Sequence, residues 1–325
     1  MKLLLMRSAG MIAACLMLAD ASAQSYPNKP VRIIVPTSPG GLTDLLARNL
    51  GQAVAESLGQ PVVVENRAGG GSIIGMVALS KSPPDGYTVA ITSKEPLVYN
   101  PLRYVKLPYD ADNDFSYVSG LVSSLSVIVA NASAPVSTFP EMIAYAKANP
   151  GKLNWATWGP GSSPAIYLEW INRRNGVEIV GIPYKGAGPS VTAIVSGQVH
   201  VTYTGIGLVA AHIQSGKLKG LAVPSAGLNS KFAGIPSLAL FNSDPDLPSG
   251  FGAYAPAKTP IAMLDRLSAE FRKALATPQL NKIMAGSMEP VGSTPAEFEA
   301  YIRKAKSNAA MVFKTLGIQP TDQPE

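Results

Sequence analysis

The sequence is poor in the side chains that carry covalent and metal chemistry. It has one cysteine, Cys15, and two histidines, His200 and His212, among 325 residues. One cysteine cannot form an internal disulfide, and no cluster of histidine and cysteine has the spacing of a zinc site. There is also no Gly-x-Ser-x-Gly pattern, and the two histidines offer little scope for a nucleophile–base pair. We therefore expect no enzyme activity, no metal and no cofactor.

Charged residues are scarce as well. They make up 15% of the chain against 46% hydrophobic residues, a balance that favours a large buried core over disorder. Lys and Arg number 27 against 21 Asp and Glu, for a formal net charge of +6. No three basic residues are consecutive, whereas nucleic-acid surfaces cluster them. We expect no nucleic-acid partner, and the mild excess favours an anionic ligand.

The amino terminus predicts export. Lys2 and Arg7 precede a small and apolar stretch over 8–19, and Ala21-Ser22-Ala23 fits the small-residue rule for cleavage. The stretch is shorter than the roughly 20 residues that a membrane-spanning helix needs. The sequence thus predicts a signal peptide over 1–23 and a periplasmic protein beginning at Gln24. Lipid anchoring at Cys15 remains an alternative.

Short β-branched runs alternate with turns and helical patterns along most of the chain. The first series comprises predicted strands over 31–35, 61–65 and 87–92 and predicted helices over 43–58 and 72–80. The second comprises predicted strands over 126–130, 152–157, 178–183, 199–204 and 218–223 and predicted helices over 138–149, 189–196 and 208–215. This alternation predicts an α/β fold with mainly parallel central sheets.

A chain of this length usually divides into two lobes. A stretch containing proline and glycine over 243–252 precedes two amphipathic helices, predicted over 261–275 and 295–316, which we expect to return to the first lobe. The predicted division gives lobe I residues 24–123 and 250–325, and lobe II residues 124–249. A hinge joins them.

Two Gly-rich turns between a strand and a helix are candidate binding loops. Pro39-Gly40-Gly41-Leu42-Thr43-Asp44 lets a ligand approach the backbone, and in Thr157–Pro164 we expect Ser163 to cap a helix with Pro164 at its first position. A helix N-terminus can hold a carboxylate without a cationic side chain. An ordinary tight turn remains the alternative for the first loop, and ordinary helix capping for the second. Gly69–Gly75 is no dinucleotide fingerprint, because Ile74 stands at its third glycine position.

Short motifs along the whole predicted mature chain resemble, in order and spacing, those of the tripartite tricarboxylate transporter receptor family, also called Bug proteins. In the first half they are Tyr26–Pro30, Ile34-Val35-Pro36, Pro39-Gly40-Gly41, Thr43-Asp44, Val64–Arg67, Pro83–Tyr87 and Leu107–Asp110. In the second half they are Gly159-x-Gly161-Ser162-Ser163, Pro183–Gly186, Gly197–Val199, Leu221–Val223 and Glu289–Pro295.

The resemblance implies a type II periplasmic binding protein fold that closes on a small carboxylate between two lobes. It also implies integral membrane permease subunits as partners, and we expect a monomer. A sensory subunit that delivers the closed form to a signalling protein is the alternative. The expected ligand-binding residues are Ser38, Pro39, Gly40, Gly41, Thr43, Asp44, Lys94, Trp158, Gly159, Gly161, Ser162, Ser163, Lys185 and Thr204.

Departures from the family pattern bear on the ligand. Thr204-Gly205 stands where many members have Asp-Asn, so the carboxylate that would pair with a ligand ammonium is missing and amino acids are disfavoured. Lys94-Glu95 replaces Gly-Thr, which adds either a cationic partner or a local ion pair. Trp158 replaces a small residue. These departures favour a di- or tricarboxylate, aromatic ones included.

Overall fold

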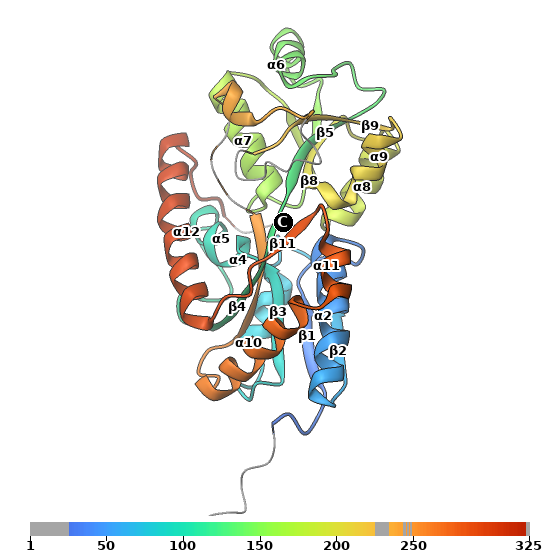
Figure 1. Ribbon diagram of the computed structural model, residues 1–325. Coiled ribbons are helices and arrows are strands. Elements are labelled where there is room, and N and C mark those ends of the chain that lie inside the picture. Colours follow the sequence, from blue (N-terminus) through green and yellow to red (C-terminus); the bar gives the residue numbers. More distant parts are fainter. Residues whose placement is uncertain (1–25, 225–233, 243–244, 246, 248, 323–325) are drawn as a thin grey trace, which may run out of the picture.

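The computed structural model describes residues 26–224, 234–242, 245, 247 and 249–322. The predicted signal peptide and Cys15 lie outside these residues. Figure 1 shows two α/β lobes stacked along the long axis of the molecule. Lobe I is built on a six-stranded sheet of order β11-β4-β10-β3-β1-β2, and lobe II on a five-stranded sheet of order β7-β6-β8-β5-β9. The predicted α/β class is confirmed.

Lobe I combines elements from both ends of the chain. Its strands are β1 (Val31–Val35), β2 (Val62–Asn66), β3 (Thr88–Ser93), β4 (Phe115–Ser124), β10 (Ser249–Pro256) and β11 (Met288–Pro290). Its helices are α2 (Leu42–Leu58), α3 (Ile73–Ser80), α4 (Glu95–Val98), α5 (Asn100–Arg103), α10 (Ile261–Leu275), α11 (Pro278–Met284) and α12 (Pro295–Leu316). Helices α10 and α12 have the predicted bounds and pack on β4, as expected for a return to the first lobe.

Lobe II is formed by the middle of the chain. Its strands are β5 (Ser126–Asn131), β6 (Asn154–Thr157), β7 (Val180–Pro183), β8 (Val201–Gly205) and β9 (Leu218–Ala222). Its α-helices are α6 (Phe139–Ala148), α7 (Ser163–Asn175), α8 (Ala187–Val195) and α9 (Ala210–Gln214). Short 3₁₀ turns follow at η1 (Ile206–Leu208) and η4 (Leu238–Phe241).

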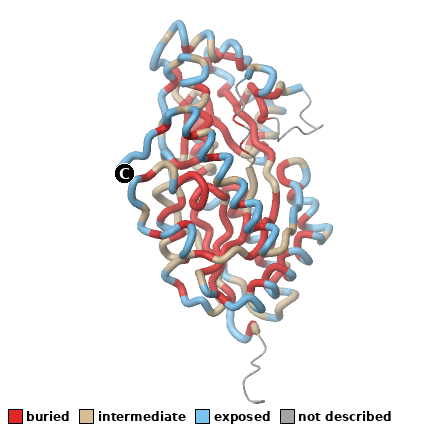
Figure 2. Tube along the Cα trace, turned by 90° about the vertical axis from the view of Figure 1, so that its left-hand side faces the viewer, coloured by how far each residue is buried: buried red, intermediate tan, exposed pale blue. Residues whose placement is uncertain are grey.

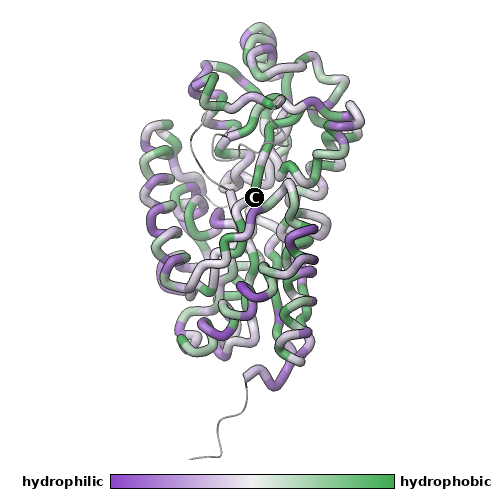
Figure 3. Tube along the Cα trace, in the orientation of Figure 1, coloured by the Kyte–Doolittle hydropathy of each residue, from purple (hydrophilic) through white to green (hydrophobic). Residues whose placement is uncertain are grey.

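The longest helix, α12, shows how local sequence fixes an element. Thr294 and Glu297 form a capping box at its start, and Gly317 ends it with a φ of 60°. Phe298, Ile302 and Phe313 are buried, so one face packs on lobe I while the other faces solvent. Figure 3 shows the same division across the molecule, with hydrophobic strands inside and hydrophilic residues on the outer helices.

The sheets are mixed, which corrects the prediction of mainly parallel sheets. β1 pairs in parallel with β2 and β3, but β10 is antiparallel to both β3 and β4, and β11 is antiparallel to β4. In lobe II, β6 is parallel to β7 and β8, whereas β5 is antiparallel to β8 and β9. A strand that enters from the other lobe follows no crossover helix within its sheet, so it can run antiparallel.

Two adjacent strands connect the lobes. β4 ends at Ser124, next to the start of β5 at Ser126, and Ser249 at the start of β10 pairs with Ser124. These positions lie near the predicted lobe boundaries, which stay a prediction. One hydrophobic cluster includes Tyr99 of lobe I and Tyr167 and Tyr203 of lobe II, so the core continues across the junction. Figure 2 shows buried residues extending through both lobes.

Candidate ligand-binding site

A cavity of about 290 Å³ lies where the two lobes meet. Both lobes contribute loops at the ends of their strands, the usual position for ligands of α/β sheets. Lobe I supplies Pro36, Thr37, Gly41, Leu42, Thr43, Gly69, Gly70, Gly71, Ser72, Ser93, Lys94, Glu95, Ser124, Ser249, Gly250 and Phe251. Lobe II supplies Ser126, Trp158, Gly159, Pro160, Ser162, Ser163, Pro183, Tyr184, Lys185, Gly186, Ala187, Tyr203, Gly205 and Leu208.

Besides the four-residue α4, four longer helices begin at this cavity. Helices α2 and α3 start in lobe I, and α7 and α8 start in lobe II. Their N-cap residues, Gly41, Ser72, Ser162 and Gly186, all line the cavity, and none caps its helix through a side-chain hydrogen bond. Each N-terminus therefore brings backbone N–H donors and a partial positive charge toward the same space.

The first-lobe loop is held by Asp44. Its carboxylate accepts hydrogen bonds from Gly40 N–H at 3.1 Å, Arg48 Nε at 3.1 Å and Asn66 Nδ2 at 2.9 Å. Burial raises the pKa of Asp44, but the hydrogen bonds from Arg48, Asn66 and Gly40 outweigh it and hold the pKa below its usual value. Asp44 is thus committed to the loop, whose Gly40 has a φ of 84°.

Of the residues predicted in this loop, Gly41 and Thr43 line the cavity. Ser38 does not line it; its Oγ donates to the carbonyl of Lys185 at 2.7 Å and so joins the two lobes. Pro39, Gly40 and Asp44 do not line the cavity either; Pro39 and Gly40 are exposed, and the buried Asp44 accepts the Gly40 N–H. The structure therefore brings part of this predicted group to the cavity.

In the second-lobe loop, Trp158, Gly159, Ser162 and Ser163 line the cavity, and Gly161 does not. Helix α7 begins at Ser163 with Ser162 as its N-cap, so the prediction of Ser163 as the cap was wrong by one residue. Ser162 makes no cap bond because its hydroxyl donates to the carbonyl of Gly159 at 2.6 Å and accepts from Trp158 N–H at 3.1 Å. The serine stabilises the loop.

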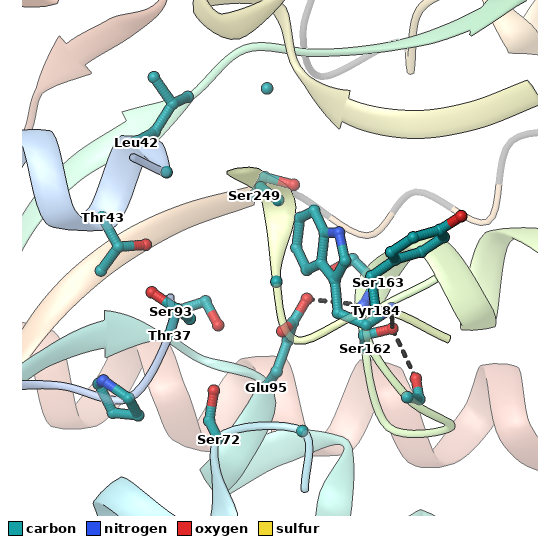
Figure 4. Close-up of a pocket in the computed structure, with 18 of the residues that line it drawn as sticks. Thr37, Leu42, Thr43, Ser72, Ser93, Glu95, Ser162, Ser163, Tyr184 and Ser249 are labelled. Atoms are coloured by element: carbon teal, nitrogen blue, oxygen red, sulfur yellow. Dashed lines mark hydrogen bonds between the residues drawn. The ribbon is translucent and has the colours of Figure 1, made fainter. Parts of the chain in front are cut away.

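Glu95 lines the cavity, although the sequence did not predict it as a site residue. Among the lining residues that were not predicted, it bears most on the charge of the cavity. It is 6% exposed, and its Oε1 accepts a hydrogen bond from the Ser163 N–H at 2.6 Å. Figure 4 shows this contact within the cavity. Burial raises the pKa of Glu95, against the opposing effect of hydrogen bonds from Ser163 and Ser93 and of the Lys94 ammonium.

Of three further predicted residues, two line the cavity and one does not. Lys94 lines the cavity and is buried, with its Nζ 5.6 Å from the centroid of the Tyr99 ring. Lys185 lines the cavity from an exposed position in lobe II. Thr204 is fully buried in β8 and does not line the cavity, whereas Gly205 does.

Several lining residues escaped the sequence prediction. Gly69–Gly71 and Ser72 form a Gly-rich turn between β2 and α3, a local pattern that could have predicted them as lining residues. Ser124, Tyr203, Ser249 and Phe251 carried none, because strand pairing alone brings them to the cavity.

The described residues that line the cavity include no histidine. Within the described residues, no group of three or more His, Cys, Asp and Glu could hold a metal ion. His200 lies outside the lining, where its Nδ1 accepts the Asn154 N–H at 3.2 Å and ties β6 to β8. None of the helices in the described ranges has the length and apolar character to span a membrane.

Comparisons with known proteins show the family to which the chain belongs. Residues 46–318 match the model of the tripartite tricarboxylate transporter family receptor. Protein BugT of Bordetella pertussis is 34% identical, with 94% of this chain and 95% of BugT covered. A Rhodopseudomonas palustris structure with adipate is 28% identical with a TM-score of 0.84, covering 91% of this chain and 100% of that one.

A second structure, MatC from Rhodopseudomonas palustris with bound malate, is 25% identical with a TM-score of 0.83, covering 88% of this chain and 99% of MatC. These likenesses extend over both lobes. The chain therefore belongs to the tripartite tricarboxylate transporter receptor family, a family of periplasmic solute-binding receptors.

Proposed function

We propose that this receptor captures a small carboxylate between its lobes in the periplasm and delivers it to a membrane permease of the tripartite tricarboxylate transporter type. The observation that carries the proposal is the convergence of four helix N-termini on one cavity. Such termini stabilise anions through N–H donors and the helix dipole. The similar Rhodopseudomonas palustris structures hold adipate and malate, which are both carboxylates.

Capture requires that the ligand favour the closed arrangement. In the structure the lobes meet around the cavity through Ser38 and Lys185 on one side and through an ion pair of Arg103 with Glu169, at 3.0 Å, on another. A ligand that contacts both lobes binds this arrangement more tightly than an open one and so shifts the population toward it. The permease would then recognise the closed receptor.

The sequence analysis favoured di- and tricarboxylates, with aromatic ligands included. Adipate and malate, held by the similar structures, are compatible with that expectation. The number of carboxylates that the ligand of this chain carries depends on side chains particular to this chain.

Isothermal titration calorimetry of residues 24–325 against acids and their neutral amides tests the proposal. Each pair, such as hexanoate with hexanamide and adipate with adipamide, differs in charge but hardly in shape. We expect an acid to bind and its amide not to, and at 100 times its Kd the acid stabilises the fold by roughly 2.7 kcal/mol. Equal binding of acid and amide, or no binding by any acid across a broad panel, would refute the proposal.

A further inference from the structure

One of the four helix N-termini at the cavity is already occupied by a carboxylate of the protein. Glu95 begins α4 in lobe I, directly after β3, and its Oε1 accepts the N–H of Ser163 in the first turn of α7 in lobe II. At 2.6 Å this is a short hydrogen bond across the lobe junction. The α7 terminus thus has its anion without a ligand carboxylate.

Glu95 is held firmly in this position. Burial raises the pKa of Glu95, whereas the Ser163 and Ser93 hydroxyls and the Lys94 ammonium lower it, so polar groups from both lobes surround the carboxyl group. Since Glu95 lines the cavity, a bound ligand meets this carboxyl group. A ligand carboxylate at the same end would find the Ser163 N–H engaged and the Glu95 carboxyl group in its place, and whenever Glu95 is ionised the two negative charges would repel each other.

The lobe I side of the cavity offers a position for one carboxylate. Oγ1 of Thr37 is a buried atom with no hydrogen-bond partner among the described residues, and Thr37 lines the cavity. Figure 4 shows Thr37, Thr43 and Ser72 on the side away from Ser163. Thr43 and Ser72 stand at the uncapped starts of α2 and α3, so hydroxyl and N–H donors coincide there.

The remaining wall is mainly apolar and aromatic. Its large apolar and aromatic side chains are those of Leu42, Trp158, Tyr184, Leu208 and Phe251, and Lys185 lines it from an exposed position. The indole of Trp158 is fixed by a hydrogen bond from its Nε1 to Ser190 Oγ at 3.2 Å, so the ring is a preformed surface. This wall suits a hydrocarbon chain or ring better than a further charged group.

We infer that the ligand of this receptor is a small monocarboxylate with an apolar body, and that Glu95 takes the place of a second ligand carboxylate at the start of α7. The inference rests on the proposed function and narrows its ligand class. It departs from the sequence expectation of a di- or tricarboxylate, because that expectation left Glu95 out of the site. The end of the ligand that faces Glu95 carries no negative charge.

Calorimetry with matched acid pairs tests the inference on residues 24–325. The pairs are hexanoate against adipate, and benzoate against benzene-1,4-dicarboxylate, in which each diacid adds one carboxylate to the far end of the monoacid. We expect the monoacid of at least one pair to bind more than tenfold more tightly than its diacid. The second carboxylate of the diacid would meet Glu95 and would lack hydrogen-bond donors. Glu95→Ala vacates the α7 terminus, so it should shift this ratio at least tenfold toward the diacid.

Glu95→Gln keeps the shape and removes the charge, and it should shift the ratio in the same direction even if Glu95→Ala folds poorly. Glu169→Gln is the matched control, since Glu169 also pairs across the lobe junction but lies outside the cavity lining, and it should leave the ratio unchanged. Wild type that prefers diacids, or a ratio that neither Glu95 variant moves, would overturn the inference while leaving the proposed function intact. Binding of neither acid type would instead overturn the proposed function.

Discussion

Replacing Asp44 by alanine removes the side chain that holds the first-lobe loop in place. Three hydrogen bonds to its carboxylate are lost, from Gly40 N–H, Arg48 and Asn66. A hydrogen bond to a charged group contributes about 1.5–3 kcal/mol, and the half-exposed Arg48 belongs at or below the lower end of that range. We expect the free energy of unfolding to fall by about 3 kcal/mol and ligand binding to weaken by about tenfold or more, because Gly41 and Thr43 lose their support.

Urea unfolding followed by circular dichroism measures the first effect, and calorimetry the second. Asp85→Asn is a suitable control, since Asp85 also has a lowered pKa but pairs with Lys29 away from the cavity lining. The pKa of Asp44 is lowered by folding, so its stabilisation is present above the unfolded pKa of about 3.9 and is lost as pH falls through the folded pKa. The stability gap between wild type and Asp44→Asn should therefore shrink in acid. A loss below about 1 kcal/mol at pH 7 for Asp44→Ala would refute this reasoning.

Three further predictions concern other parts of the chain. Burial raises the pKa of Glu95, so wild-type stability should fall as pH rises above the unfolded pKa of about 4.3. In urea unfolding, the stability of Glu95→Gln should depend less on pH than that of wild type. Parallel pH profiles for the two proteins would contradict this prediction. Gly252→Ala places a Cβ 2.1 Å from Phe298 Cζ and should cost about 1–3 kcal/mol in thermal unfolding, whereas Gly234→Ala, with nothing within 4 Å, should cost far less; equal losses would argue against the packing explanation. Mass spectrometry of periplasmic extract should find a mature terminus at Gln24, and an acylated cysteine terminus would contradict cleavage there.

Regular elements with a strong periodic pattern could be predicted from the sequence. The strand over 31–35 and the helices over 261–275 and 295–316 have the predicted bounds. Strand β10 (Ser249–Pro256) could not be predicted from the sequence, because it contains Gly250 and Gly252, which are typical of a linker. A Cβ at Gly252 would collide with Phe298, so this glycine serves packing between distant segments.

The residues of the candidate site likewise divide into those that a local sequence pattern predicts and those that it does not. The Gly-rich turns before α2 and α7 are local signals, and they led to Gly41, Thr43, Trp158 and Ser163, all of which line the cavity. Glu95 was visible as a departure from the family pattern, but its contact with α7 depends on how the two lobes meet. No pattern within one segment encodes that approach, so sequence reasoning assigned an anion to α7 without seeing that the chain supplies one.

The position of β10 has a consequence for how the chain folds. The sheet of lobe II is formed by one continuous stretch from Ser126 to Ala222, but the sheet of lobe I has β10 between β3 and β4. A chain delivered amino end first can complete lobe II while lobe I still lacks an inner strand. During that interval β3 and β4 present unpaired edges, which invite pairing with other chains. Truncation after lobe II would therefore yield an aggregation-prone fragment rather than a smaller receptor.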